Sequence, residues 1–224
     1  GFHEQPIEVK ITNATEGAKI YYTLDETEPT PEDGMLYTGP ITIDKTTVLR
    51  TSAHRPGYVS SPIETHTYLY LNDVIQQSNM HSSVTDDEVL GPQMRAALAA
   101  LPTISIVTTE DRELKTGSST GGVPSVEQPE VKCSAEWLNP DGSEGFQLNC
   151  GASRFGGFFT NFAKKSIRLF FRKEYGEATL KYPVFDGFEY EIPPVDEFDA
   201  ISLRSGSHDM RERGAYMSNR FADD

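Results

Sequence analysis

Three blocks of sequence decide the fold of the second half of this chain: GFQLNCGASRFGG at residues 145–157, AKKSIRLFFRKEYGEATLKYPVF at 163–185 and DEFDAISLRSGSHD at 196–209. The middle block opens with a strand pattern over residues 164–172, in which alternate side chains point to opposite faces of a sheet. Ile167, Leu169 and Phe171 share one face, and Lys165 is the only charged residue on it. A lysine is costly to desolvate there. It needs a carboxylate partner or an anionic ligand, unless it reaches solvent at the sheet edge.

The residues before this strand predict a β-hairpin. Residues 131–138 and 146–152 alternate in polarity, and the turn-rich sequence NPDGSEG joins them. A hairpin centred on that turn pairs Cys133 with Cys150, and the same register pairs Trp137 with Phe146. Opposed cysteines on neighbouring strands are close enough for a disulfide, which predicts an oxidising, exported location. The alternative is a pair of buried free thiols that pack as small apolar groups.

Taken together, the three blocks resemble the amino-terminal half of the CotH family of atypical, spore-coat-type protein kinases. The resemblance implies ATP-dependent phosphoryl transfer to a protein, with Lys165 holding the phosphates of ATP. Gly156 and Gly157 would let backbone amides approach a phosphate closely, although a bulge or turn between strands explains the two glycines equally well. In that family the aspartates that bind Mg²⁺ come later than any residue here. We therefore expect no catalytic residue in this fragment, and we expect ATP and Mg²⁺ as cofactors only in a full-length parent.

The first 71 residues show a different sequence pattern. Short β-type runs alternate there with clusters of Asn, Asp, Gly and Pro, as in a small β-sandwich. The runs are residues 7–11, 19–23, 41–43, 47–53 and 64–71. Three segments resemble the Fn3-like domain at the carboxy-terminal end of chitobiases and β-hexosaminidases. They are GAKIYYTLDETEPT, YTGPITIDKTTVLRTSAHRPGYVSS and THTYLY. That module accompanies exported, multidomain proteins and has no catalytic residues of its own.

The residues between these two regions predict a connection. Residues 72–100 are polar at first and then form a short helix over 92–100, which Pro102 ends. A buried strand is expected over 103–108, and the run at 115–128 has too few apolar residues to pack. The expected fold is mainly β, with an Fn3-like sandwich at 1–71, a linker and short helix at 72–100, and the truncated, sheet-rich α+β lobe of a CotH-like kinase at 101–224.

Composition limits the partners of the chain. Its 224 residues carry 20 Lys and Arg against 34 Asp and Glu, a net charge of -14 that disfavours nucleic acid as a partner. No apolar run approaches the roughly 20 residues of a membrane span, and the five histidines have no metal-ligand spacing. We expect other domains of the same chain as partners, in a bacterial protein at the cell surface or outside the cell.

A second function is compatible with the same sequence. In this alternative the chain is a non-catalytic extracellular module for structure, adhesion or carbohydrate binding, and its partners are surface proteins or polysaccharide. Aromatic side chains would then provide the contacts. The candidates are Tyr22, Tyr37, Tyr58 and Trp137.

Overall fold

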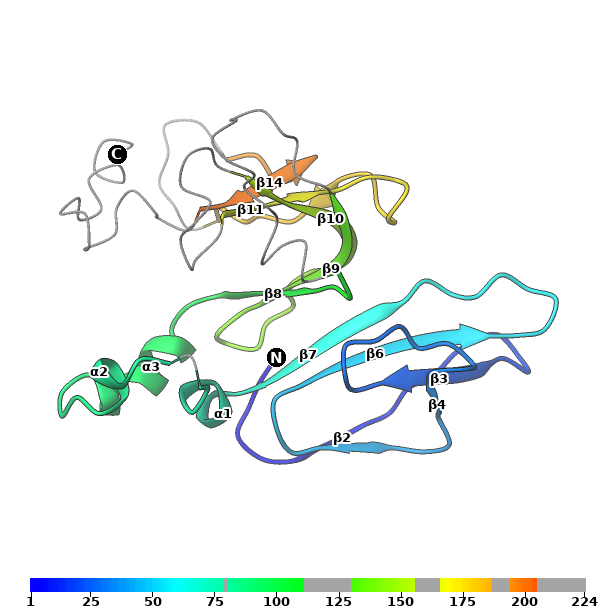
Figure 1. Ribbon diagram of the computed structural model, residues 1–224. Helices are drawn as coiled ribbons and strands as arrows, with labels where there is room; N and C mark the ends of the chain where they lie inside the picture. Colours follow the sequence, from blue (N-terminus) through cyan, green and yellow to red (C-terminus); the bar gives the residue numbers. More distant parts are fainter. Residues whose placement is uncertain (79, 111–129, 156–165, 187–193, 205–224) are drawn as a thin grey trace, which may run out of the picture. The chain divides into compact units, whose positions relative to one another are not determined.

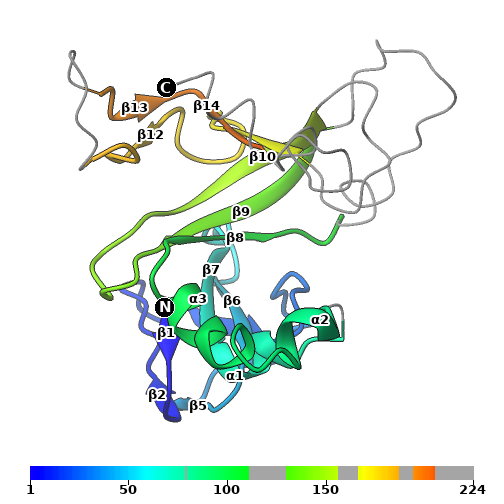
Figure 2. The same ribbon diagram turned by 90° about the vertical axis from the view of Figure 1, so that its left-hand side faces the viewer.

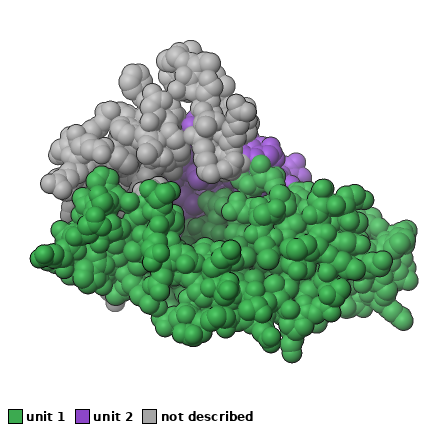
Figure 3. Space-filling model, turned by 60° about the horizontal axis from the view of Figure 1, so that its bottom comes forward, with its two compact units in different colours: residues 1–109, 134–149 green, residues 110–133, 150–224 purple. Residues whose placement is uncertain are grey.

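The computed structural model describes residues 1–78, 80–110, 130–155, 166–186 and 194–204 (Figure 1). Strands dominate these residues, so the prediction of a mainly β fold is confirmed. The chain divides into two compact units, coloured separately in Figure 3. Unit 1 consists of residues 1–109 and 134–149, and unit 2 of residues 110–133 and 150–224. We describe each unit by itself.

Unit 1 contains two sheets in its first 70 residues. The larger sheet has the strand order β1-β7-β6-β3-β4, in which β1 runs parallel to β7 and the other neighbours are antiparallel. Its strands are β1 (Phe2–His3), β3 (Lys19–Thr23), β4 (Met35–Leu36), β6 (Thr47–His54) and β7 (Glu64–Tyr70). The smaller sheet pairs β2 (Ile7–Val9) with β5 (Ile41–Ile43). The predicted strands over 19–23 and 41–43 therefore have the observed bounds.

Apolar side chains from both sheets form the core of this part of unit 1. Leu49 on β6 and Ile43 on β5 are 1% and 2% exposed. The end of β7 is tied to β5 by the hydroxyl of Tyr70, which donates to the carbonyl of Ile43 at 2.7 Å. Burial of a large aliphatic side chain is worth about 1.5–3 kcal/mol. The two sheets are thus joined by apolar packing and by a buried hydrogen bond.

Short helices follow β7, as Figure 2 shows. They are α1 (Leu71–Ile75), α2 (Ser82–Thr85), the 3-10 turn η1 (Gly91–Gln93) and α3 (Met94–Ala99). The predicted helix over 92–100 corresponds to η1 and α3. By contrast, α1 and α2 lie where an irregular linker was expected. Each is too short to show a helical repeat in the sequence, and α1 gains its contacts by packing against α3.

Unit 1 is completed by strand β8 (Thr103–Val107) and by most of β9 (Val131–Leu138). These strands pair antiparallel, from Thr103 with Leu138 to Val107 with Ser134. After β9 the chain turns at residues 139–142, where the amide of Gly142 donates to the carbonyl of Asn139 at 3.1 Å. Gly142 has a φ of +74°, a conformation that glycine adopts without steric cost. The predicted hairpin is therefore present, and its first strand has the expected bounds.

Unit 2 is built on β10 (Gln147–Phe155), of which residues 150–155 belong to this unit. It pairs antiparallel with β11 (Ser166–Phe170), which in turn pairs with β14 (Ala200–Leu203). A separate two-stranded sheet joins β12 (Leu180–Lys181) to β13 (Glu197–Phe198). The run at 115–128, which we predicted to be a loop, lies outside the described residues. Among the described residues, the structure has no helix long and apolar enough to cross a membrane.

Candidate functional site

The residues predicted to hold nucleotide are next to the paired ends of β10 and β11. Gly156, Gly157 and Lys165 themselves lie outside the described residues. The last described pair of the two strands is Phe155 with Ser166. In the sequence Gly156 directly follows the first member of this pair, and Lys165 directly precedes the second. The described strands therefore end directly before and directly after the sequence of the candidate site.

The predicted alternation of β11 is confirmed where the structure describes it. Leu169 and Phe171 are 0% and 3% exposed, whereas Arg168, the residue before Leu169, is exposed. Arg168 donates from Nε to the hydroxyl of Ser202 on β14 at 3.0 Å. The face that includes Leu169 and Phe171 is thus a core face, as expected for the strand that Lys165 precedes.

Strand β10 places a buried cation one residue before the described part ends. Arg154 is 5% exposed and lies opposite Ile167 of β11. Ser153, its neighbour in the strand, is 8% exposed and lies opposite Arg168. The burial of an arginine is costly unless anionic or hydrogen-bonding groups surround it. The sequence patterns did not indicate that Arg154 would be buried.

The two cysteines face each other, but they are not bonded. Their Sγ atoms are 3.4 Å apart, whereas a disulfide requires about 2.05 Å. Both are free thiols in the structure, so the predicted disulfide is wrong. The alternative of two buried thiols describes this state. The predicted register is nevertheless right, because the amide of Trp137 donates to the carbonyl of Phe146 at 2.8 Å.

The environment of Cys150 favours its protonated form. Its side chain is 0% exposed, and that of Cys133 is 4% exposed. The contact with the Cys133 thiol, followed by burial and by the negative charge of Glu130, raises the pKa of Cys150 far above its ordinary value. A thiol of this kind is a poor nucleophile in the folded protein.

A second cluster in unit 2 was not predicted from the sequence. The Glu130 carboxylate pairs with Arg172 at 2.9 Å. Burial, and then the hydrogen bond and charge of Glu130, raise the pKa of Tyr175 to about 12. Gly151 lies under this cluster, where a Cβ atom would overlap Glu130 and come within 2.7 Å of the Tyr175 ring. No local pattern predicts the cluster, because its members come from three separate segments.

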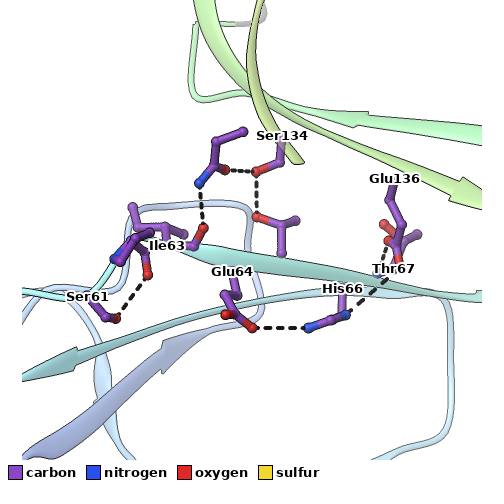
Figure 4. A network of polar contacts seen from close by, with 10 residues as sticks. Ser61, Ile63, Glu64, His66, Thr67, Ser134 and Glu136 are labelled. Carbon is purple, nitrogen blue, oxygen red and sulfur yellow. Dashed lines mark hydrogen bonds and ion pairs between the residues drawn. The ribbon is translucent and has the colours of Figure 1, made fainter. Parts of the chain in front are cut away.

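Unit 1 contains a buried chain of polar groups that joins β7 to β9 and to the start of β10 (Figure 4). The hydroxyl of Thr65 donates to that of Ser134 at 2.9 Å, and the Ser134 hydroxyl donates to the Asn149 side chain at 2.7 Å. Asn149 then donates to the carbonyl of Ile63 at 2.9 Å. Thr65 and Ser134 are 1% and 2% exposed. Each polar group in this network therefore depends on a neighbouring group as its hydrogen-bond partner.

The same two strands are also linked by a carboxylate. Glu136 on β9 accepts the amide of Thr67 at 2.7 Å, and its other oxygen lies 4.0 Å from His66. The side chain of Glu136 is 12% exposed, and that of His66 is 45% exposed. The hydroxyl of Thr67 contacts that of Ser105 on β8 at 2.7 Å. Strand β7 is therefore held through polar side chains of both strands of the β8–β9 pair.

A polar cavity of about 350 Å³ lies elsewhere in unit 1. Its lining includes His3, Glu4, Asp44, Asp73 and Arg95. Glu4 and Arg95 form an ion pair with a nitrogen to oxygen distance of 2.5 Å, and one oxygen of Asp73 accepts the amide of Thr46 at 2.7 Å. Within the described ranges, no three His, Cys, Asp or Glu side chains are grouped in a way that could hold a metal ion.

The four aromatic residues of the alternative function have different surroundings. Tyr22 and Tyr37 are half-buried and meet edge to face, with ring centroids 6.5 Å apart. Trp137 packs on Phe146 at 6.1 Å, as the hairpin register predicts. Tyr58 alone among the four is exposed, at 63%. The four rings are thus not equivalent as contact residues.

Comparison with known proteins identifies the first part of the chain. Residues 9–68 match the model of the family described as Fn3 associated. The match runs from the last residue of β2 into β7, so this part of unit 1 is an Fn3-associated domain, in agreement with the Fn3-type prediction. No curated protein and no solved structure matched the chain. The resemblance of the second half to CotH kinases stays a prediction.

Proposed function

We propose that this chain belongs to an exported, multidomain bacterial surface protein of the CotH-like kinase type. In this proposal the Fn3-associated domain is non-catalytic, and the β10–β11 region binds the phosphates of ATP. Lys165 provides the positive charge, and Gly156 and Gly157 provide the close approach of the backbone. The parent protein would transfer the phosphoryl group to a protein with the help of Mg²⁺, whereas this chain alone would not turn over.

The charge pattern of the sequence carries the proposal. Residues 145–173 contain six basic residues and no acidic one, in a chain with 34 Asp and Glu against 20 Lys and Arg. The basic residues are Arg154, Lys164, Lys165, Arg168, Arg172 and Lys173. A local positive field in an acidic protein is what an anionic ligand requires. The stretch includes both paired strand ends next to Gly156 and Lys165.

Arg154 is the described basic residue nearest to Gly156 in the sequence. This arginine is 5% exposed on the strand that leads directly into Gly156. An Arg side chain recognises phosphate through several N–H groups, and a Lys side chain does so as a compact charge. Phosphoryl transfer depends mainly on positioning and on stabilisation of charge. A basic region held on paired strands meets the first of these needs.

ATP binding tests the proposal directly. Binding of Mg-ATP is measured on the 224-residue chain and on the parent protein by calorimetry, and by the anisotropy of a fluorescent ATP analogue if affinity is low. We expect Lys165→Ala to weaken binding at least about tenfold, which corresponds to about 1.4 kcal/mol. The matched control is Lys164→Ala, which changes the same charge on the neighbouring residue and should weaken binding by less than about threefold.

Two results would count against a nucleotide site. One is that the folded parent protein binds no ATP. The other is that Lys164→Ala and Lys165→Ala weaken binding equally, since a diffuse basic surface would respond to either loss of charge. Adenosine serves as a further control, because a site built for phosphates should bind it far more weakly than ATP.

A second candidate function rests on Tyr58. This ring and Val59 are 63% and 95% exposed at the loop between β6 and β7, inside the Fn3-associated match. Arg55 stacks over the Tyr58 ring at 4.5 Å, which presents an aromatic face with its orientation fixed. If the chain is a surface module, a polysaccharide pull-down should be lost in Tyr58→Ala and kept in Tyr22→Phe. If Tyr58→Ala still binds the polysaccharide, this loop is excluded as the binding site.

A further inference from the structure

The thiol pair in unit 2 is arranged for a reaction that the folded state itself prevents. Cys133 and Cys150 lie on paired strands with their Sγ atoms 3.4 Å apart. Closing a disulfide requires these atoms to approach to about 2.05 Å, a small movement of two side chains. Both residues are buried, at 4% and 0% exposure. Proximity favours the bond, and burial excludes the reagents that form it.

We propose that Cys133 and Cys150 are a dithiol–disulfide pair whose redox state is set while the chain folds and is then retained. A chain that folds under reducing conditions keeps both thiols, as in the structure described here. A chain that folds in the presence of an oxidant closes the bond across the hairpin. The redox state of the pair would thus depend on the compartment in which the chain folded.

The oxidant is a small disulfide such as glutathione disulfide. One cysteine thiolate attacks a sulfur of that disulfide, forms a mixed disulfide and releases one glutathione thiolate. The second cysteine loses its proton, and its thiolate attacks the protein sulfur of the mixed disulfide. That step expels the second glutathione thiolate. The protein loses two electrons and two protons, and one glutathione disulfide becomes two glutathione molecules.

Burial stops both directions of this exchange in the folded protein. The attacking species must be a thiolate that reaches a disulfide sulfur. The raised pKa of Cys150 keeps its thiol protonated, and neither side chain has enough exposed surface to meet glutathione. Exchange therefore requires opening of the β9–β10 pairing, which happens rarely once the strands are closed.

The test compares two folding histories of the same chain. The chain is unfolded with reductant and refolded either with dithiothreitol or in a glutathione redox buffer. It is then denatured with excess N-ethylmaleimide and weighed by mass spectrometry. We expect two maleimide adducts after reducing refolding and none after oxidative refolding, with the protein monomeric in both cases. Two adducts or intermolecular dimers after oxidative refolding would overturn the pairing.

The second part of the test concerns retention. The chain refolded with dithiothreitol is freed of reductant, kept folded in glutathione disulfide, and sampled over hours. We expect oxidation to be at least about a hundredfold slower than in the same buffer with denaturant. Equal rates in the folded and unfolded protein would show that folding does not fix the redox state.

Single variants separate the bond from the packing. Cys133→Ala and Cys150→Ala each leave one thiol. Each should give one adduct after reducing refolding, and either one adduct or one glutathione mixed disulfide after oxidative refolding, but never an intramolecular bond. If a single variant does not fold, the two-history comparison on the unaltered chain still decides the matter, because it requires no substitution.

Discussion

Gly151 has no room for a side chain. A Cβ atom there would overlap the Glu130 carboxylate and approach the Tyr175 ring to 2.7 Å. Glu130 is paired with Arg172 at 2.9 Å, so moving the carboxylate aside would disturb that ion pair. We predict that Gly151→Ala destabilises the chain by about 2 kcal/mol, the usual cost of forcing extra volume into a packed site. Urea denaturation measures the change.

The matched control for this substitution is Gly39→Ala. A Cβ atom at residue 39 would meet nothing within 4 Å, so the free energy of unfolding should change by less than about 0.5 kcal/mol. Equal effects at the two glycines would mean that the Glu130 cluster imposes no steric limit on Gly151.

Tyr175 should make stability depend on alkaline pH. Its pKa is raised to about 12 in the folded chain, against about 10 for an unfolded tyrosine. The folded state therefore holds this proton more tightly. Its contribution is fully present below about pH 10 and is lost as the pH rises through about 12. We predict that the loss of stability between pH 9 and pH 11 is smaller in Tyr175→Phe.

Urea denaturation at the two pH values checks this prediction. The pKa values of Tyr68 and Tyr70 are also raised, chiefly by burial. Those residues are present in both proteins, so their effect cancels in the comparison. An identical pH dependence in the two proteins would remove Tyr175 as a contributor.

At the scale of elements, the attachment of β7 to β9 depends on hydroxyl groups. Ser134 accepts from Thr65 and donates to Asn149, and it is 2% exposed. Ser134→Ala leaves the buried Thr65 hydroxyl and the half-buried Asn149 side chain without this partner. We predict a loss of about 1–2 kcal/mol in the free energy of unfolding, because an unsatisfied buried group costs its full desolvation.

A double-mutant cycle shows whether the effect belongs to this pair. Thr65→Val and Ser134→Ala together should cost less than the sum of the single changes, by about 1 kcal/mol. Thr42→Val, at an exposed threonine of β5, is the control and should be nearly neutral. Strict additivity of the two buried substitutions would contradict a shared hydrogen-bond chain.

At the scale of the whole molecule, charge opposes compactness. The net charge of -14 creates repulsion that dissolved ions screen. We predict that the melting temperature rises by a few degrees between about 20 mM and 300 mM sodium chloride, and that potassium chloride gives the same rise. A melting temperature that falls with salt would show that attractive ion pairs outweigh the repulsion.

Local patterns predicted the strands well and the long-range contacts poorly. Residues 131–138 and the pairing of Trp137 with Phe146 followed from alternation and from the turn sequence between them, since both are properties of neighbouring residues. The bond from Thr65 to Ser134 joins residues 69 positions apart, and no periodicity relates them. Helix α1 depends on α3 for its packing and could not be predicted from its own residues.

The candidate site was predictable to a similar degree. Alternation identified the buried face of β11, and the hairpin register identified the opposed cysteines. The same reasoning could not decide between a disulfide and two thiols, because that choice depends on redox conditions as well as on distance. The burial of Arg154 and the Glu130 cluster required the three-dimensional arrangement.

The discontinuity of unit 1 has a consequence for biosynthesis. Residues 1–109 reach their full set of contacts only when residues 134–149 join them. A ribosome makes the chain from its amino terminus, so the Fn3-associated domain is made long before Ser134, Glu136 and Asn149 leave the exit tunnel. During that interval Thr65, Thr67 and the carbonyl of Ile63 lack these hydrogen-bond partners. The last step in the maturation of this domain is therefore timed by the translation of a later part of the chain.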